Sequence, residues 1–299
     1  YKYPIWSWFV AIIFAELNTI SAGGLVRRRW ILVLPHEKLK TTAYSFEALV
    51  DEVVFVFGPL IATALSTYVA PEAGLMASMC FVALGQPALA RLKDTEPPFG
   101  AKNLSNADVS IWRRRSTQAI ILPIFFVGAY FGSVGITVLA FLNSIERQEL
   151  TGALLAVWAL GSATAAIFNG VIKWQMNHAQ LFTYSLAFML FASFALLMVD
   201  NVWQLAIVLY LNGIGISPVL VNAYATMESE VSTEELTEAM TWVTTGTPTG
   251  GALGSAVAGQ IIDSFGASRG FWIPIAALII ANLALLPYLK VWLRLRSRS

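Results

Sequence analysis

The sequence predicts an all-α, polytopic helical membrane protein with nine transmembrane helices. Nine stretches of about twenty apolar residues, the length that crosses a bilayer, are separated by short loops that hold nearly every charge. Hydrophobic residues make up 57% of the 299, charged residues 12%, and mean hydropathy is +0.66. A water-soluble chain of this length would expose large apolar patches if it carried nine such runs. The runs are continuous and too long for barrel strands, so they predict helices.

We expect the helices at residues 5–26, 47–68, 71–92, 118–143, 149–172, 180–199, 202–226, 233–263 and 270–293. The longest polar stretch between them, 93–117, contains prolines, glycine and a basic run, and predicts a cytoplasmic central loop. Residues 1–92 would then hold three helices and residues 118–299 a six-helix bundle. Because the first span runs inward from a chain start without methionine, we also expect that an N-terminal portion precedes Tyr1.

The distribution of basic residues predicts the orientation. Of the 19 lysines and arginines, 16 fall on alternate connections and on the C-terminal tail. By the positive-inside rule these segments are cytoplasmic. The sequence therefore predicts a multi-pass protein of the plasma membrane, with residue 1 outside and the C-terminus cytoplasmic.

This orientation has a direct test. A cysteine introduced at Glu146 should react with a membrane-impermeant maleimide from outside, and one at Asn103 from inside. The reverse pattern of labelling would contradict the topology.

Composition also narrows the class of function. A single cysteine, Cys80, excludes an internal disulfide, and two histidines, His36 and His178, make a dense metal cluster unexpected. The basic clusters are short and adjoin membrane spans, so nucleic acid is not an expected partner. No nucleophile with a base and no cofactor motif lies within the spans. We therefore expect neither an enzyme nor a cofactor or metal site.

Acidic residues within spans are candidate functional groups, because an ionisable side chain at bilayer depth costs several kcal/mol. Glu16 lies near the centre of the first expected helix, close to Asn18. It would bind a proton or a cation, or else stay protonated and hydrogen-bonded to a neighbouring helix. Asp51 and Glu52, near the start of the second helix, would form a cytoplasmic gate with an arginine of 27–29, or a solvated surface cluster.

Uncharged polar residues and helix-breaking residues complete the candidates. Tyr130 and Asn212 lie within expected helices and would contact a solute or bond to a neighbouring helix. Gly58 and Pro59 interrupt the second helix, where proline removes a backbone hydrogen bond. The eighth helix repeats this pattern and adds small residues about one turn apart, which permit close packing with sliding between helices. Its candidate residues are Gly246, Pro248, Gly250 and Gly254.

Two helices that contain glycine and proline lie six spans apart, one on either side of the polar loop. This arrangement is expected of a protein built from two six-helix halves. The sequence here resembles the major facilitator superfamily of secondary transporters. Gly58-Pro59 is similar to that family's fifth-helix antiporter motif, with Ala62 and Thr63 where the motif has two further glycines. The Gly250 to Gly259 segment occupies the place of the eleventh helix. The chain would then match the family's helices four to twelve and lack the first three, with 1–92 as the remaining half of the N-terminal bundle.

The resemblance implies alternating-access transport, with the family's helices one, four, seven and ten lining the cavity. In this chain the counterparts of helices four, seven and ten carry Glu16, Asn18, Tyr130 and Asn212. Glu16 would couple transport to an ion, in the first place H⁺, and the others would contact a small lipophilic or amphipathic solute. We expect a monomer in the lipid bilayer, and no transport by these 299 residues alone. The alternatives are a non-transporting receptor or scaffold, an inactive truncated homologue and, last, a membrane enzyme.

Overall fold

A computed structural model describes residues 36–95, 114–172, 174–231 and 235–294, together with Val26, Arg29, Trp30, Val33, Leu34 and Ile111. The chain divides into two units, with boundaries after Asp51, Pro71 and Asn103. One unit takes residues up to 51 and 72–103, and the other takes 52–71 and 104–299. Each is described here by itself.

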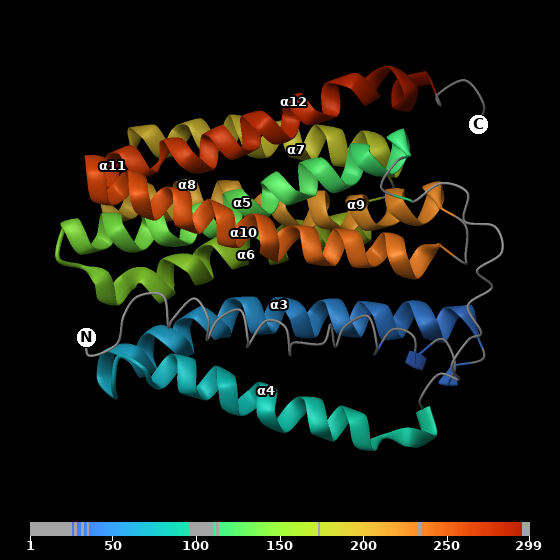
Figure 1. Cartoon of the computed structure of the whole chain (residues 1–299), viewed down its shortest axis with the longest axis horizontal. Coiled ribbons are helices and arrows are strands. Elements are labelled where there is room, and N and C mark those ends of the chain that lie inside the picture. Colours follow the sequence, from blue (N-terminus) through green and yellow to red (C-terminus); the bar gives the residue numbers. More distant parts are fainter. Residues whose placement is uncertain are drawn as a thin grey trace. The chain divides into compact units, whose positions relative to one another are not determined.

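The first part of the described chain forms two long helices, α3 (Glu37–Tyr68) and α4 (Ala73–Arg91), followed by a single 3₁₀ turn, η1 (Lys93–Thr95) (Figure 1). α3 continues through Gly58 and Pro59. Arg29 donates hydrogen bonds to the carbonyl oxygen of Leu92 at 3.0 Å and to Oγ1 of Thr95 at 3.1 Å. Arg29 is thereby bonded to the end of α4.

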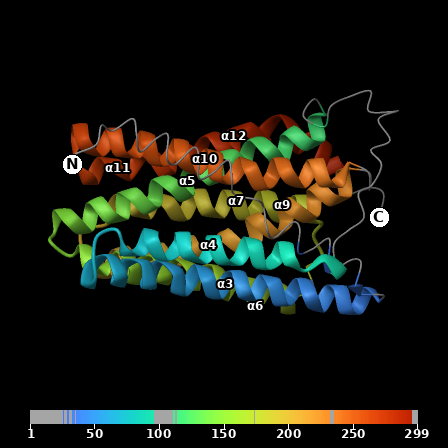
Figure 2. The same cartoon turned by 60° about the horizontal axis from the view of Figure 1, so that its bottom comes forward.

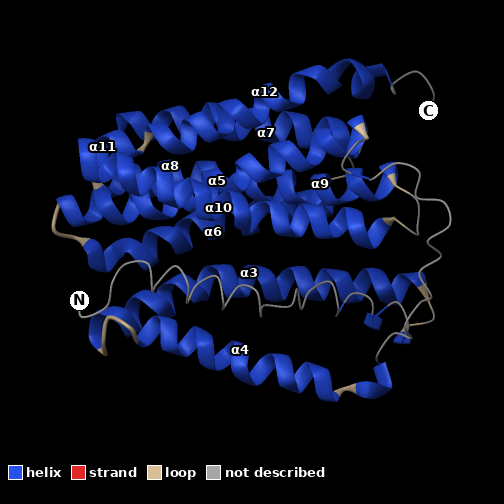
Figure 3. Cartoon of the chain, viewed as in Figure 1, coloured by secondary structure: helices blue, strands red, loops and turns tan. Residues whose placement is uncertain are grey.

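The rest of the described chain is also helical, as Figure 3 shows. Its α-helices are α5 (Arg115–Ser144), α6 (Thr151–Val171), α7 (His178–Phe194), α8 (Val202–Ile214), α9 (Ile216–Glu230), α10 (Leu236–Phe265), α11 (Ala267–Gly270) and α12 (Trp272–Arg294). Two 3₁₀ turns, η3 (Gln148–Leu150) and η4 (Ala195–Met198), precede α6 and follow α7.

The core of this bundle forms around α5. α5 packs against α10 and α12, α6 packs against α8, and α7 packs against α9 and α12 (Figure 2). Its buried face carries large side chains, among them Ile124, Tyr130 and Leu142, which are fully enclosed. Since burial extends over most of the length of α5, this helix positions the others.

The outer surface is apolar, as lipid contact requires. Phe81, Phe191 and Trp203 are 77%, 73% and 80% exposed, and a water-soluble protein rarely exposes so many large apolar side chains. Six described helical segments are long and apolar enough to cross a membrane: Ala73–Arg91, Arg115–Ser144, Gln148–Asn169, His178–Met198, Val202–Glu230 and Ala267–Tyr288. The prediction of an all-α membrane protein is confirmed. The count of nine stays a prediction, because the first expected span, 5–26, lies outside the described residues except for Val26, and α3 and α10 are not among these six segments.

Three helix starts differ by three residues or more from the sequence-based expectation. α3 begins at Glu37 rather than at 47. α5 begins at Arg115 rather than at 118. The hydroxyl of Thr117 donates to the carbonyl oxygens of Ile111 and Arg114, which ties the first turn to the chain before it, and no side chain caps the first amides. α10 begins at Leu236 rather than at 233. The side chain of Glu235, the residue before it, makes no capping bond and pairs with Arg114 instead.

The seventh expected span is divided into two helices at Gly215. The amide of Gly215 bonds back to the carbonyl oxygen of Asn212, three residues earlier, which tightens the backbone at that point. Pro218 follows in the first turn of α9 and has no N–H to donate to Ile214. Proline therefore explains why one continuous apolar run yields α8 and α9.

Candidate functional site

Tyr130 and Asn212, predicted as solute contacts, lie together inside the bundle. The hydroxyl of Tyr130 on α5 donates to Oδ1 of Asn212 on α8 at 3.1 Å, and Ser193 Oγ on α7 donates to the same oxygen at 2.6 Å. The Asn212 amide nitrogen donates to the carbonyl oxygens of Ala192 at 3.1 Å and Val208 at 3.0 Å. One asparagine thus joins three helices.

Aromatic rings enclose this network. The ring of Tyr130 lies 5.9 Å from that of Trp158 on α6 and 5.7 Å from that of Phe131, measured between ring centroids. Tyr130 and Asn212 have no exposed surface. Buried polar groups with all these hydrogen bonds hold helices in register. In the described bundle this pair is part of the packed interior, and its contact with a solute stays a prediction.

α5 and α10 approach each other until their backbones touch. A β-carbon at Gly128 or Gly132 on α5 would overlap the backbone oxygen of Thr247 or Gly251 on α10. A β-carbon at Gly250 or Gly254 on α10 would in turn overlap that of Phe125 or Ala129.

Each helix therefore contributes a pair of glycines four residues apart to one crossing, here called the glycine crossing. Small residues at this spacing are what lets membrane helices pack at such close range.

A second close crossing joins α6 to α8. A β-carbon at Gly161 would overlap the backbone oxygen of Tyr210, and one at Gly213 would overlap that of Trp158. The Tyr210 hydroxyl donates to Oγ1 of Thr164 at 3.2 Å beside it. This crossing holds α8 in place directly before its break at Gly215.

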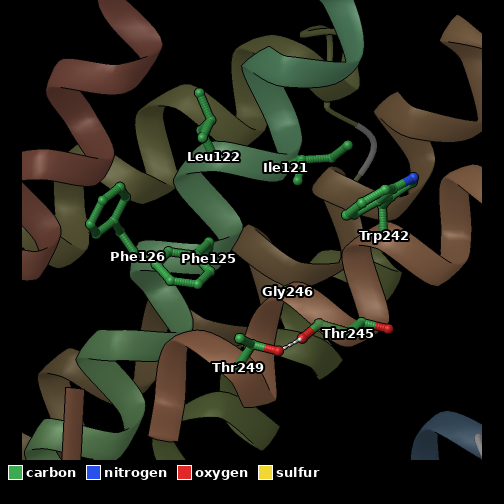
Figure 4. A pocket seen from close by; sticks show the side chains of 8 residues that line it. All are labelled: Ile121, Leu122, Phe125, Phe126, Trp242, Thr245, Gly246 and Thr249. Atoms are coloured by element: carbon green, nitrogen blue, oxygen red, sulfur yellow. Dashed lines mark hydrogen bonds between the residues drawn. The ribbon is translucent and has the colours of Figure 1, made fainter. Parts of the chain in front are cut away.

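A cavity of about 370 Å³ opens between α5 and α10, and we name it the α5/α10 groove (Figure 4). Its lining residues are Ile121, Leu122, Phe125 and Phe126 on α5, and Trp242, Thr245, Gly246 and Thr249 on α10. Apolar and aromatic side chains with a few polar groups are typical of small-molecule sites, whose volumes run from about 300 to 1,000 Å³.

The groove offers aromatic faces and an almost wholly apolar surface that includes two threonines, without a charged lining residue. Phe125 and Phe126 pack edge to face, with ring centroids 5.3 Å apart. Thr249 Oγ1 donates to the carbonyl oxygen of Thr245 at 2.8 Å, so this hydroxyl can only accept a further hydrogen bond. Such a surface suits an uncharged or amphipathic molecule with a flat apolar part and a hydrogen-bond donor.

The other predicted site residues lie in several places. Gly246 lines the groove, Gly250 and Gly254 form the glycine crossing, and Pro248 lies within α10, which continues through it. Gly58 and Pro59 lie within α3, and a β-carbon at Gly58 would meet no atom within 4 Å. Asp51 and Glu52 also lie in α3, but their side chains are outside the described part, as are Glu16 and Asn18 altogether. Their roles as coupling and gating residues stay predictions.

The α10 side of the groove was only weakly indicated by the sequence. Trp242, Thr245 and Thr249 are spaced three and four residues apart, so they lie along one face of the helix. Threonines in a membrane helix usually bond to their own backbone, as Thr249 does. In the sequence these residues therefore do not stand out from threonines that only satisfy their own helix.

Comparison with known proteins supports one assignment. The model of the Major Facilitator Superfamily matches residues 147–298, just over half of the chain and the part from η3 to the end of α12. No curated protein and no solved structure gave a significant match. Together with the apolar helices, the match identifies an integral membrane protein of the transporter class. The chain belongs to the major facilitator superfamily.

Proposed function

We propose that this protein moves a small lipophilic or amphipathic solute across the plasma membrane by alternating access, coupled to an ion and in the first place to H⁺. The α5/α10 groove is the observation that carries the proposal, because it presents aromatic and apolar faces with two threonines in a bundle of apolar helices. In the family pattern α5 corresponds to the seventh helix, one of those that line the cavity. No catalytic role is proposed for any residue.

The remaining elements of the proposal follow the sequence. Glu16 binds the coupled ion, and ion and solute cross the membrane in opposite directions, as in an antiporter. Asp51 and Glu52 belong to a cytoplasmic gate. Residues 1–92 contribute to the N-terminal bundle as the counterparts of the family's helices four to six. The protein works as a monomer. The N-terminal ends of α5, at Arg115, and of α10, at Leu236, lie on the cytoplasmic side.

Groove substitutions test the proposal in proteoliposomes of the full-length protein, screened with a panel of neutral and amphipathic aromatic compounds under an imposed pH gradient. For a compound that is taken up, Trp242→Ala should raise KM about tenfold, since an aromatic contact of roughly 1.5 kcal/mol is lost. Thr249→Val, which keeps the shape and removes the hydroxyl, should raise KM by a smaller factor.

Trp203→Ala is the matched control, because Trp203 is 80% exposed on α8 and lies outside the groove. It should leave KM unchanged. Equal KM values for the wild type, Trp242→Ala and Thr249→Val would remove the groove from the solute path. Specific binding of the compound without uptake would favour a receptor.

A further inference from the structure

Gly246 differs from the glycines of α10 that form the glycine crossing. A β-carbon at Gly250 or Gly254 would overlap a backbone oxygen of α5, whereas one at Gly246 would meet no atom within 4 Å. Helix packing therefore explains the first two glycines and leaves Gly246 without a packing role. Because glycine within a helix is less stable than alanine by up to about 1 kcal/mol, the missing side chain does not serve the stability of α10.

The open space at Gly246 belongs to the α5/α10 groove. Trp242, Gly246 and Thr249 line it from α10 at intervals of four and three residues, so they share one face of the helix. Figure 4 shows Gly246 between the other two, with Phe125 and Phe126 of α5 across the groove. The bare backbone at Gly246 thus forms the floor of the groove between two larger residues.

The groove closes one turn farther along the two helices. Gly250 follows Gly246 by four residues, about 6 Å along α10, and there a β-carbon would overlap the backbone oxygen of Phe125. The two helices are therefore in backbone contact at Gly250 and leave room at Gly246. A molecule in the groove can lie on Gly246 and extend no farther than this contact.

A bare floor favours a thin, flat molecule. Carbon atoms attract each other best at about 3.5 to 4.0 Å, and a further gap of about 0.5 to 1 Å loses a quarter to a half of that attraction. A planar ring can approach the backbone at Gly246 with all its atoms while the aromatic side chains of the groove pack against its face or edge. A puckered saturated ring is thicker, so fewer of its atoms reach this distance. Glycine is the residue that allows a backbone to approach a ligand so closely.

We propose that Gly246 determines the specificity of the α5/α10 groove for planar aromatic molecules, or for the planar aromatic part of a larger solute. Gly246 contacts the molecule through its backbone, and any added side chain would lift the ring from the floor. That the bound molecule is also transported rests on the proposed function, while binding to the groove is measurable without transport.

The test compares two competitors for one binding site. Tritiated β-naphthol is bound to the full-length protein in nanodiscs, with empty nanodiscs as the background, and is displaced by unlabelled β-naphthol or by its saturated analogue decahydro-β-naphthol. The two compounds share their carbon skeleton and their hydroxyl group and differ in planarity. The wild type should bind the planar compound about tenfold more tightly. Gly246→Ala should reduce this preference to about threefold or less, and Gly246→Leu should abolish specific binding of both compounds.

Gly259→Ala and Gly259→Leu are the matched controls. A β-carbon at Gly259 would also meet no atom within 4 Å, and this residue of α10 lies outside the groove. Both variants should keep the affinities and the preference of the wild type. Since alanine at Gly246 enters open space, that variant should be at least as stable as the wild type toward denaturant. If Gly246→Leu fails to fold, the alanine variant still decides.

The same preference for the planar compound in the wild type and in Gly246→Ala would overturn the assignment of Gly246. Equal binding of both compounds by the wild type, or no specific binding of β-naphthol, would overturn it as well. A planar preference that Gly246→Ala reduces, together with no uptake of any aromatic compound into proteoliposomes, would instead refute the proposed function and leave the role of Gly246 intact.

Discussion

Replacing Gly250 with alanine should force α5 and α10 apart and lower the free energy of unfolding by about 1 to 3 kcal/mol. The added methyl group would overlap the backbone oxygen of Phe125. A flexible side chain could turn away, but a backbone oxygen moves only with its helix. Gly128→Ala, on the opposite helix, should have an effect of similar size because it would overlap the backbone of Thr247.

Gly259→Ala on the same helix is the matched control. A β-carbon there would meet no atom within 4 Å, and alanine is a better helix former than glycine by up to about 1 kcal/mol. This control should be neutral or stabilising. Denaturant titration of the full-length protein in mild detergent measures all three variants. Equal stability of Gly250→Ala and Gly259→Ala would contradict the close approach of the helices.

Glu16→Gln should abolish solute accumulation driven by a pH gradient while leaving the protein folded. A glutamine cannot take up or release a proton, so the coupling between ion and solute, worth about 5-fold to 150-fold in affinity, would be lost. Exchange of labelled solute at equal concentrations, without a gradient, should continue. The comparison of the two modes in proteoliposomes separates coupling from binding.

Glu149→Gln supplies a control for the loss of one carboxylate. Glu149 is an exposed residue of η3 whose carboxylate lies 3.9 Å from Nη1 of Arg147, and it should be dispensable for accumulation. If Glu16→Gln accumulates solute as well as the wild type does, Glu16 has no coupling role and another group must carry the ion.

Local signals in the sequence predicted most of the fold. Apolar length located most of the helices described in 37–95 and 115–294 to within a few residues, because bilayer thickness constrains helix length directly. The exceptions are the charged N-terminal extension of α3, the division into α8 and α9, and the short α11. The glycine spacing of α10 predicted a close approach to a neighbour, and the crossing with α5 shows which neighbour it is. Tyr130 and Asn212 were each expected to contact a solute or to bond to a neighbouring helix, and the structure shows a hydrogen bond between them.

The features that escaped prediction depend on residues far apart in the chain. Arg114 and Glu235 are separated by 121 positions. By itself Glu235 fits a capping role in its own helix, so nothing local reveals its partner. The groove likewise needs one face of α5 and one face of α10, and neither face differs in sequence from a surface that contacts lipid. The break before Pro218 is different, since proline chemistry signals it locally and the length of the apolar run concealed it.

Protection of a groove cysteine by the solute tests the proposed site most directly. A compound identified by uptake should slow the alkylation of Thr249→Cys, in the Cys80→Ala background, in proportion to its occupancy. It should not slow the alkylation of Val257→Cys, which is exposed on α10 outside the groove. Protection at position 249 alone is the expected result. Equal alkylation of Thr249→Cys with and without a saturating transported compound would show that the solute binds elsewhere.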